Sequence, residues 1–296
     1  MTARASWRKR RRMERCIFVS DLHGRRDRYD KLFRLIACDK PEAVLIGGDF
    51  LPSAFAPTPG ETVAFVNGYL QETLARLRST MQEDYPRIFL IMGNDDERAR
   101  EPEVLQLERS GLIEYIHMKG VALGLFWVYG YACVPPTPFL LKDWERYDVS
   151  RYVDPGCIPP EEGKYSYPVS GREVKFTTIE RDLRCLAGDD VLDNAVFLFH
   201  APPYGTHLDL ADNENVWVDG VLLDGHIGSI AVRRFIEDRQ PLLTLHGHAH
   251  GSAARSGTWR DRIGRTHVFS AAHDGFEIAA VCFDLSDLDA AVRKLL

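Results

Sequence analysis

The stretch Cys16-Ile17-Phe18-Val19-Ser20-Asp21-Leu22-His23-Gly24 joins an apolar run to a polar cluster, and this junction decides the fold. Its first five residues have the composition of a buried β-strand. Asp21 and His23 then follow at the end of that strand. Because alternate residues of an extended segment point to the same side, these two side chains are expected to share one face. The junction therefore predicts a strand that brings two polar groups to one place.

The same junction recurs four times further along the chain. Apolar runs at residues 43–46, 88–92, 195–199 and 242–245 predict buried strands. Each run is followed by a polar cluster, and these clusters are Gly47-Gly48-Asp49, Gly93-Asn94-Asp95-Asp96, His200-Ala201-Pro202-Pro203 and His246-Gly247-His248-Ala249-His250. In open α/β sheets, sites form beyond the carboxyl ends of the strands. We therefore expect clusters that are distant in sequence to meet at one edge.

Helical patterns separate the apolar runs. The predicted helices cover residues 26–38, 61–82, 99–110, 177–187 and 228–238. At the start of the fourth helix, Thr177 and Glu180 have the spacing of a capping box. Residues 121–133 predict one or two strands, and residues 266–271 and 278–283 predict antiparallel strands. This alternation predicts an α/β fold in which helices cover the sheets.

The composition is that of an ordinary globular protein. Of 296 residues, 45% are hydrophobic and 27% are charged, which excludes a disordered, collagen-like or coiled-coil chain. The formal net charge is -6, and six of the 37 basic residues lie before Met13, so the rest of the chain is more acidic still. An acidic body argues against a nuclease and against nucleic acid as a partner.

The domain organisation is simple. We interpret residues 1–12 as a basic, disordered tail, with Met13 as an alternative natural start to Met1. Residues 13–296 are predicted to form one domain. Within it, residues 134–175 are rich in proline and aromatic side chains and form a predicted insertion. Such a segment is either a lid over a binding site or a packed surface loop.

Cysteines and targeting signals indicate a cytoplasmic protein. The six cysteines are scattered without a C-x-x-C pair, which is typical of reduced thiols. The basic start is not followed by an apolar segment long enough for a signal peptide. Residues 120–141 carry no charge, but Pro135, Pro136 and Pro138 interrupt them, so we predict no membrane span.

The polar clusters together offer carboxylates, imidazoles and one amide oxygen. That mixture suits two divalent ions such as Mn, Fe or Zn, and it suits neither a thiolate zinc site nor an all-oxygen calcium site. Gly47 and Gly48, which precede Asp49, have no Cβ that would hinder close approach of backbone and metal. We therefore expect two divalent metal ions as cofactors.

These motifs resemble the signature of the calcineurin-like metallophosphoesterases, which is D-x-H, G-D, G-N-H-[DE], H and G-H-x-H in that order. The matching residues are Asp21 and His23, Gly48-Asp49, Gly93-Asn94, His200, and Gly247-His248-x-His250. The resemblance extends from residue 16 to about residue 284. It implies a four-layer α/β/β/α sandwich built around two mixed β-sheets.

The resemblance also implies a ligand set for each metal. It places Asp21, His23 and His250 on one ion. It places Asn94, His200 and His248 on the other ion, with Asp49 bridging both. Two cations that share a carboxylate lower the pKa of a bridging water and stabilise charge on the phosphoryl group. We therefore predict direct hydrolysis by metal-bound hydroxide, without a phosphoenzyme.

One residue departs from the family pattern. The family commonly has histidine after the asparagine, where it assists the leaving group, and this chain has Asp95. An aspartate could donate a proton only if its pKa were raised. The predicted catalytic residues are Asp49, Asn94, Asp95 and His200; other candidates for leaving-group assistance are Tyr204, His207, His226 and His273.

Two further residues of the clusters are expected to be structural. Asp96 fills the last acidic position of the third motif, where a hydrogen-bonding role is expected. His246 precedes the last motif and could orient a metal ligand. We favour instead a satisfied histidine at the end of its strand.

The favoured function is hydrolysis of a small phosphodiester or nucleotide-like ester. Loss of the leaving-group histidine weakens the case for the alternative, a phosphomonoesterase or protein phosphatase. A second alternative is a non-catalytic metal-binding scaffold. Degenerate members of the family usually lose metal ligands, whereas all seven are present here. The sequence makes no prediction of oligomeric state.

Overall fold

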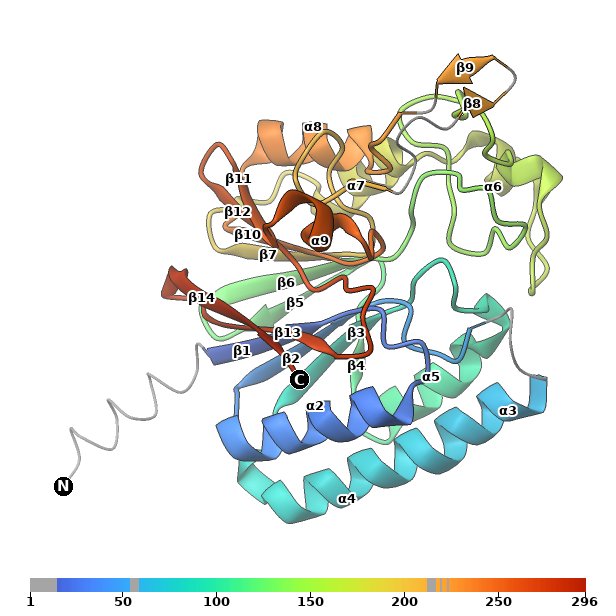
Figure 1. The fold of residues 1–296 in the computed structure, drawn as a ribbon. Coiled ribbons are helices and arrows are strands. Elements are labelled where there is room, and N and C mark those ends of the chain that lie inside the picture. Colours follow the sequence, from blue (N-terminus) through green and yellow to red (C-terminus); the bar gives the residue numbers. More distant parts are fainter. Residues whose placement is uncertain (1–14, 54–58, 212–216, 219, 223) are drawn as a thin grey trace.

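The computed structural model describes residues 15–53, 59–211, 217–218, 220–222 and 224–296. The predicted basic tail lies outside these residues. Two six-stranded sheets pack face to face, with β2 (Ala43–Gly47) near β7 (Ala195–Phe199) and β3 (Arg87–Ile91) near β6 (Phe126–Tyr131) (Figure 1). The central strands β2, β3 and β7 are almost wholly apolar and buried, as expected for sheets covered on both faces.

The first sheet has the strand order β14-β13-β1-β2-β3-β4. Its remaining strands are β1 (Arg15–Val19), β4 (Glu114–Tyr115), β13 (Ala279–Asp284) and β14 (Asp287–Leu295). The strands from β1 to β4 run parallel. β13 runs antiparallel to both β1 and β14, which confirms an antiparallel strand near residues 278–283.

The second sheet has the order β11-β12-β10-β7-β6-β5. Its remaining strands are β5 (Lys119–Leu123), β10 (Leu243–His246), β11 (Arg260–Ile263) and β12 (Thr266–Ser270). The strands β6, β7, β10 and β12 run parallel, and β5 and β11 are antiparallel edges. The prediction for residues 266–271 is therefore only partly right. β12 is antiparallel to β11 but parallel to β10, and it lies in a different sheet from β13 because the chain crosses between sheets after β12.

Helices cover the outer face of each sheet, which confirms the four-layer α/β/β/α sandwich (Figure 1). On the first sheet these are α2 (Arg26–Asp39), α3 (Pro59–Ala64), α4 (Gln71–Met81) and α5 (Glu101–Arg109). The second sheet is covered by α7 (Ile179–Ala187) and α8 (Ile230–Arg239). The long helix predicted at residues 61–82 is continuous, but a π-helical piece, η1 (Phe65–Leu70), joins α3 to α4.

Shorter elements fall outside the predicted pattern. They are η2 (Gln82–Asp84), η3 (Arg98–Arg100), η4 (Pro160–Glu162), α6 (Gly171–Phe176), β8 (Trp217–Val218), β9 (Val221–Leu222) and α9 (Ser252–Ser256). The predicted capping box is wrong by one residue. Thr178 caps α7 by accepting a hydrogen bond from the Arg181 N–H, whereas Thr177 follows the end of α6. Among the helices of the described residues, none has the length and apolar character needed to cross a membrane.

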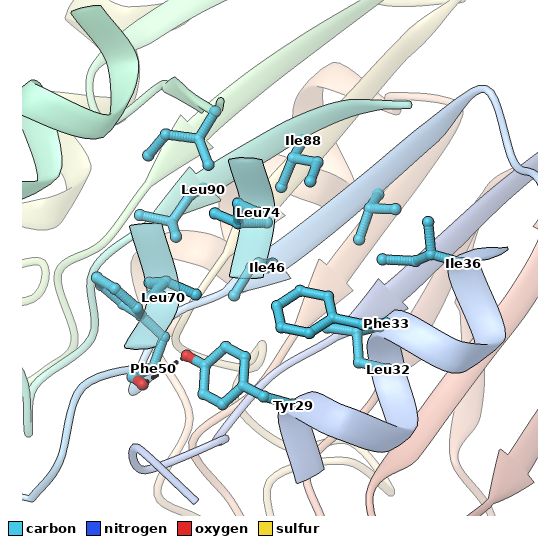
Figure 2. Close-up of a pocket in the computed structure, with 12 residues that line it drawn as sticks. Tyr29, Leu32, Phe33, Ile36, Ile46, Phe50, Leu70, Leu74, Ile88 and Leu90 are labelled. Carbon is cyan, nitrogen blue, oxygen red and sulfur yellow. Dashed lines mark hydrogen bonds between the residues drawn. The ribbon is translucent and has the colours of Figure 1, made fainter. Parts of the chain in front are cut away.

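An apolar core fills the space between the first sheet and its helices (Figure 2). Leu32 of α2, Leu74 of α4 and Ile88 of β3 lie there and are buried. Tyr29 also lies in this core, and its hydroxyl donates a hydrogen bond of 2.7 Å to the carbonyl of Phe50. Phe50 follows the predicted ligand Asp49. The core thus fixes the loop that begins where β2 ends.

Candidate metal centre

The polar clusters meet at the carboxyl ends of the central strands, as predicted. Backbone hydrogen bonds join the loops: the Asp21 N–H donates to Gly48 O at 3.0 Å, and the Gly247 N–H donates to His200 O at 3.0 Å. The first bond links the loops after β1 and β2, and the second links those after β7 and β10. Each sheet therefore gathers its own polar loops, and the packing of the sheets brings the two sets together.

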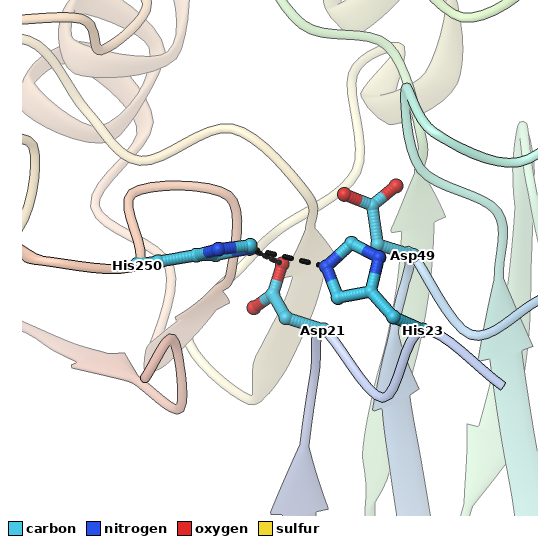
Figure 3. Close-up of side chains that lie close together, drawn as sticks. All are labelled: Asp21, His23, Asp49 and His250. Atoms are coloured by element: carbon cyan, nitrogen blue, oxygen red, sulfur yellow. Dashed lines mark hydrogen bonds and ion pairs between the residues drawn. The ribbon is translucent and has the colours of Figure 1, made fainter. Parts of the chain in front are cut away.

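Four predicted ligands form one tight group (Figure 3). The candidate ligand atoms of Asp21, His23, Asp49 and His250 all lie within 4.8 Å of one another. His250 Nε2 lies 3.2 Å from Asp21 Oδ1 and 3.3 Å from His23 Nε2. Two imidazole nitrogens that face each other beside carboxylates have the donor chemistry of a divalent-cation site. These residues therefore fit a metal ion.

A second group of predicted ligands contacts Asp49. His200 Nε2 is 3.0 Å from Asn94 Oδ1 and 3.2 Å from Asp49 Oδ2. His200 Nδ1 donates to the carbonyl of Gly47 at 2.8 Å, so in the neutral ring the lone pair is on Nε2. The His248 ring lies 5.3 Å from the His200 ring, centroid to centroid. Asp49 thus belongs to the first group and contacts the second.

The backbone of these loops is unusual. Asp21, His23, Asp49 and His248 have φ angles of 56°, 47°, 49° and 69°, in the left-handed region. Such conformations cost about 1–3 kcal/mol for a residue other than glycine and cluster at functional sites. They turn the chain sharply after each strand, so that side chains from different strands can point to a common centre.

Glycine is required at two positions of these loops. Gly48 has a φ of 93°, and a Cβ there would lie 2.6 Å from His200 Nδ1. A Cβ on Gly93 would lie 2.4 Å from Asp49 Oδ1 and 2.7 Å from His200 Nε2. Glycine at these two positions therefore permits close packing of the loops around Asp49 and His200; close approach of the backbone to a metal stays a prediction.

Opposite charges balance across the site. Burial raises the pKa of Asp49, but the neighbouring His200 outweighs burial and lowers this pKa to about 2. The pKa of Asp21 is likewise well below its usual range, because His250 outweighs burial. Burial lowers the pKa values of His23 and His200, but the carboxylates raise both to about 9, through Asp95 and Asp49 respectively. Metal binding to such a site would displace protons from imidazole.

His248 differs from these two histidines. Burial, followed by the charge of His200, lowers the pKa of His248 to about 3. His248 is therefore neutral at pH 7, which is the form that binds a metal.

Several supporting residues carry no sequence motif. The Ser20 hydroxyl donates to Asp21 Oδ2. Arg28 of α2 is buried, and its guanidinium donates to the carbonyls of Asp21, at 2.6 Å, and Gly275, at 2.5 Å. An arginine in an amphipathic helix gives no signal that it reaches back to the preceding loop. Its helical spacing indicates only an ordinary polar position.

The two expected structural roles are confirmed. Asp96 is fully buried and accepts hydrogen bonds from the backbone N–H groups of Leu51 and Gly93, both at 2.8 Å. His246 is also fully buried, and its ring nitrogens lie 2.8 Å from the Ala201 carbonyl and from the Thr244 hydroxyl. Both hydrogen-bonding positions of His246 are therefore satisfied within the protein.

The leaving-group candidates have other partners in the structure. Asp95 contacts His23, with 3.1 Å between Oδ2 and Nδ1. The Tyr204 hydroxyl donates to Asp224 at 2.5 Å. His226 Nδ1 lies 2.8 Å from Asp209, and His273 Nε2 lies 3.3 Å from Glu277. His207 contributes backbone groups to hydrogen bonds with Asp261 and Ser252.

Comparison with known proteins identifies the family. The family model of the calcineurin-like phosphoesterases matches residues 15–252. Among curated proteins, none matches the chain. One solved structure is 18% identical, with a TM-score of 0.56 over 96% of this chain and 98% of its own. TT1561 of Thermus thermophilus is 17% identical, with a TM-score of 0.54 over 95% of this chain and 98% of its own.

At these identities the two solved structures support the fold alone. The family model supports more, since the residues it matches make up most of the chain and include all seven predicted ligands, from Asp21 to His250. The chain belongs to the calcineurin-like phosphoesterase family and is a metal-dependent phosphoric ester hydrolase.

Proposed function

We propose that this protein hydrolyses a small phosphodiester or nucleotide-like ester at a centre that holds two divalent cations. The proposed ligands of one cation are Asp21, His23 and His250; those of the other are Asn94, His200 and His248; Asp49 is shared. The observation that carries the proposal is the position of Asp49. Its carboxylate belongs to the first group of ligands, and its Oδ2 lies 3.2 Å from His200 Nε2 of the second group. We propose Mn, Fe or Zn as the ions, because the ligands combine carboxylates with imidazoles.

Each protein group has a definite part in this proposal. When bound, two such cations lower the pKa of a water molecule and bind phosphoryl oxygens. Asp49 would be shared by both ions, and the hydrogen bond from His200 to Gly47 O holds the imidazole that would bind the second ion. Asn94 supplies a neutral oxygen and so limits the negative charge of the site. Since each of these side chains is assigned to an ion, we propose direct hydrolysis without a phosphoenzyme.

The diester preference rests on the residue after Asn94. Asp95 stands where the family commonly has a histidine that assists the leaving group, and its carboxylate is engaged by His23. An ionised carboxylate cannot donate a proton, and it repels a phosphomonoester dianion more strongly than a diester monoanion. We propose the cytoplasm as the location. We do not propose nucleic acid as a substrate, because the body of the chain is acidic.

Two chromogenic esters test this function. With added Mn²⁺, bis-p-nitrophenyl phosphate should be hydrolysed at least about tenfold faster than p-nitrophenyl phosphate, as measured by kcat/KM. His200→Ala should abolish both reactions. The matched control is His267→Ala, which should leave both unchanged, because His267 pairs with Leu243 at the end of β10 remote from the ligand loops. Faster hydrolysis of the monoester would contradict the diester proposal. Failure of the metal-loaded wild type to cleave either ester would contradict the proposed substrate class.

A further inference from the structure

Asp95 lies between two proposed ligands of the first cation. Its Oδ2 is 3.1 Å from His23 Nδ1, and its backbone N–H donates a hydrogen bond of 2.8 Å to Asp49 Oδ1. Its side chain is 12% exposed. Its other oxygen, Oδ1, is closed off from solvent and has no hydrogen-bond partner in the described residues. Asp95 therefore contacts an imidazole through Oδ2 and the shared carboxylate through its backbone N–H, while its Oδ1 is shielded from solvent.

The contact with Asp95 determines which nitrogen of His23 faces the metal centre. A carboxylate only accepts hydrogen bonds, so His23 Nδ1 must be the donor. In neutral His23 the lone pair is then on Nε2, which lies 3.3 Å from His250 Nε2. A carboxylate on the far nitrogen fixes the orientation of a metal-binding imidazole and makes it a stronger ligand. The same ring could bind poorly if it were free to rotate.

On the basis of the proposed two-cation centre, we propose that Asp95 is a positioning residue that holds His23 for the first cation and is not the acid that protonates the leaving group. The substitution that separates this chain from the common family pattern thereby gains a definite role. Asp95 supports the first cation through its contact with His23, and its backbone N–H holds Asp49 in place by a hydrogen bond. The leaving group must then be one that departs with little protonation, which agrees with an activated ester.

The test measures metal binding apart from activity. Metal-free wild type, Asp95→Ala and Asp95→Asn are titrated with Mn²⁺ by calorimetry. Asp27→Asn serves as the matched control, because Asp27 is an exposed carboxylate that pairs with Arg25 and contacts no proposed ligand. We expect one of the two Mn²⁺ dissociation constants to rise by roughly 10- to 100-fold in Asp95→Ala. The rise should be smaller in Asp95→Asn, which keeps an acceptor oxygen, and absent in Asp27→Asn.

The alternative role gives a different result. If Asp95 were the leaving-group acid, both dissociation constants would stay unchanged, and kcat would fall mainly for esters with alkyl leaving groups. That pattern would overturn the proposal. Thermal unfolding of each metal-free variant shows whether a weaker site merely reflects a lost fold. A wild type that binds only one ion would contradict the two-cation proposal, while the ratio of variant to wild-type affinity would still decide the role of Asp95.

Discussion

The ligand loops and the insertion are built on opposite principles. The ligand loops comprise residues 20–24, 47–51, 93–96, 200–203 and 246–250, and the insertion comprises residues 134–175. Four proposed ligands in the loops have left-handed backbone, and two buried carboxylates lie close together there. The left-handed backbone opposes folding in the metal-free protein, whereas the charges of the two carboxylates are balanced by neighbouring histidines. In the insertion, by contrast, the buried charged side chains have partners: Lys142 pairs with Glu145, and Asp143 accepts hydrogen bonds from the N–H groups of Arg98 and Ser166. We infer from this difference that the ligand loops serve the chemistry of the site, whereas the insertion serves the stability of the fold.

The insertion is attached to the segment that follows the third ligand loop. Asp143 accepts a hydrogen bond of 2.8 Å from the Arg98 N–H. The Arg98 guanidinium carbon lies 5.2 Å from the ring centroid of Trp144 and 4.9 Å from that of Tyr167. Because Arg98 is four residues beyond Asn94, these contacts hold the chain just after the proposed ligand. The insertion therefore supports the site, and whether it also covers the substrate stays a prediction.

The largest effect should come from the buried ion pair of the insertion. Lys142 and Glu145 are fully buried, with 2.5 Å between Nζ and Oε2, and Lys142 also donates to Thr137 O at 2.8 Å. Removing one partner of a buried pair costs about 3–5 kcal/mol. Lys142→Met should lower the free energy of unfolding in urea by about that amount. The kcat of the remaining folded protein should stay close to wild type.

A double variant sharpens this test. Lys142→Met combined with Glu145→Gln removes both charges, so it should recover much of the lost stability. A single variant as stable as wild type, or one that loses kcat and stability together, would break the proposed division between the two regions.

The second effect should appear in the ligand loops. Gly93→Ala places a methyl group against Asp49 and His200, and displacement of reacting groups by about 1 Å can cost 10²-fold in rate. We expect kcat/KM to fall about 10²-fold or more at temperatures where the variant is folded. Gly171→Ala is the matched control in the insertion, since nothing lies within 4 Å of a Cβ there. Equal activity of the two variants would contradict the close packing around Asp49.

The smallest effect should be a pH dependence where the insertion joins the second sheet. His117 packs against Trp144, with ring centroids 4.9 Å apart, and its Nδ1 accepts a hydrogen bond from the Ala132 N–H. Burial, assisted by nearby Arg146, lowers the pKa of His117 to about 3. The unfolded chain therefore binds the extra proton as pH falls below about 6.5, and the folded chain does not.

This difference in proton binding by His117 fixes the direction in which the free energy of unfolding changes with pH. The free energy of unfolding should decrease on acidification below pH 6.5, by roughly 1 kcal/mol per pH unit from this group. Urea unfolding at pH 7 and pH 5 should show a smaller decrease for His117→Gln than for wild type. The control is His207→Gln, which should retain the wild-type decrease. An identical decrease in all three proteins would show that His117 does not report on the attachment of the insertion.

Sequence reasoning worked best where neighbouring residues act together. Asp21 with His23, or His248 with His250, can be recognised because each pair lies at the end of an apolar strand. Asp95 and His23 lie 72 positions apart in the sequence, and the loop that carries His23 has left-handed backbone at Asp21 and His23. No local sequence pattern therefore indicates the contact between Asp95 and His23. The prediction of antiparallel pairing for residues 266–271 was only partly right for a similar reason, because the pairing depends on where the chain crosses between the sheets.

The insertion was the least predictable region. Its composition indicated a loop rich in aromatic side chains, but not the buried Lys142 or the contacts of the Arg98 guanidinium with the rings of Trp144 and Tyr167. A lysine three residues before a glutamate is usually an exposed pair. The pair of Lys142 and Glu145 is buried only because other parts of the folded chain enclose it.

The central claim of the proposed function is that two cations share Asp49. The most direct test of this claim is to measure how many metal ions are bound and whether they are magnetically coupled. Electron paramagnetic resonance of the Mn²⁺-loaded protein, combined with elemental analysis, measures both quantities. We predict two Mn²⁺ per wild-type chain with the signal of a magnetically coupled pair, and loss of the coupled signal in Asp49→Asn. One isolated ion per wild-type chain, or an unchanged coupled pair in Asp49→Asn, would contradict a shared two-cation centre.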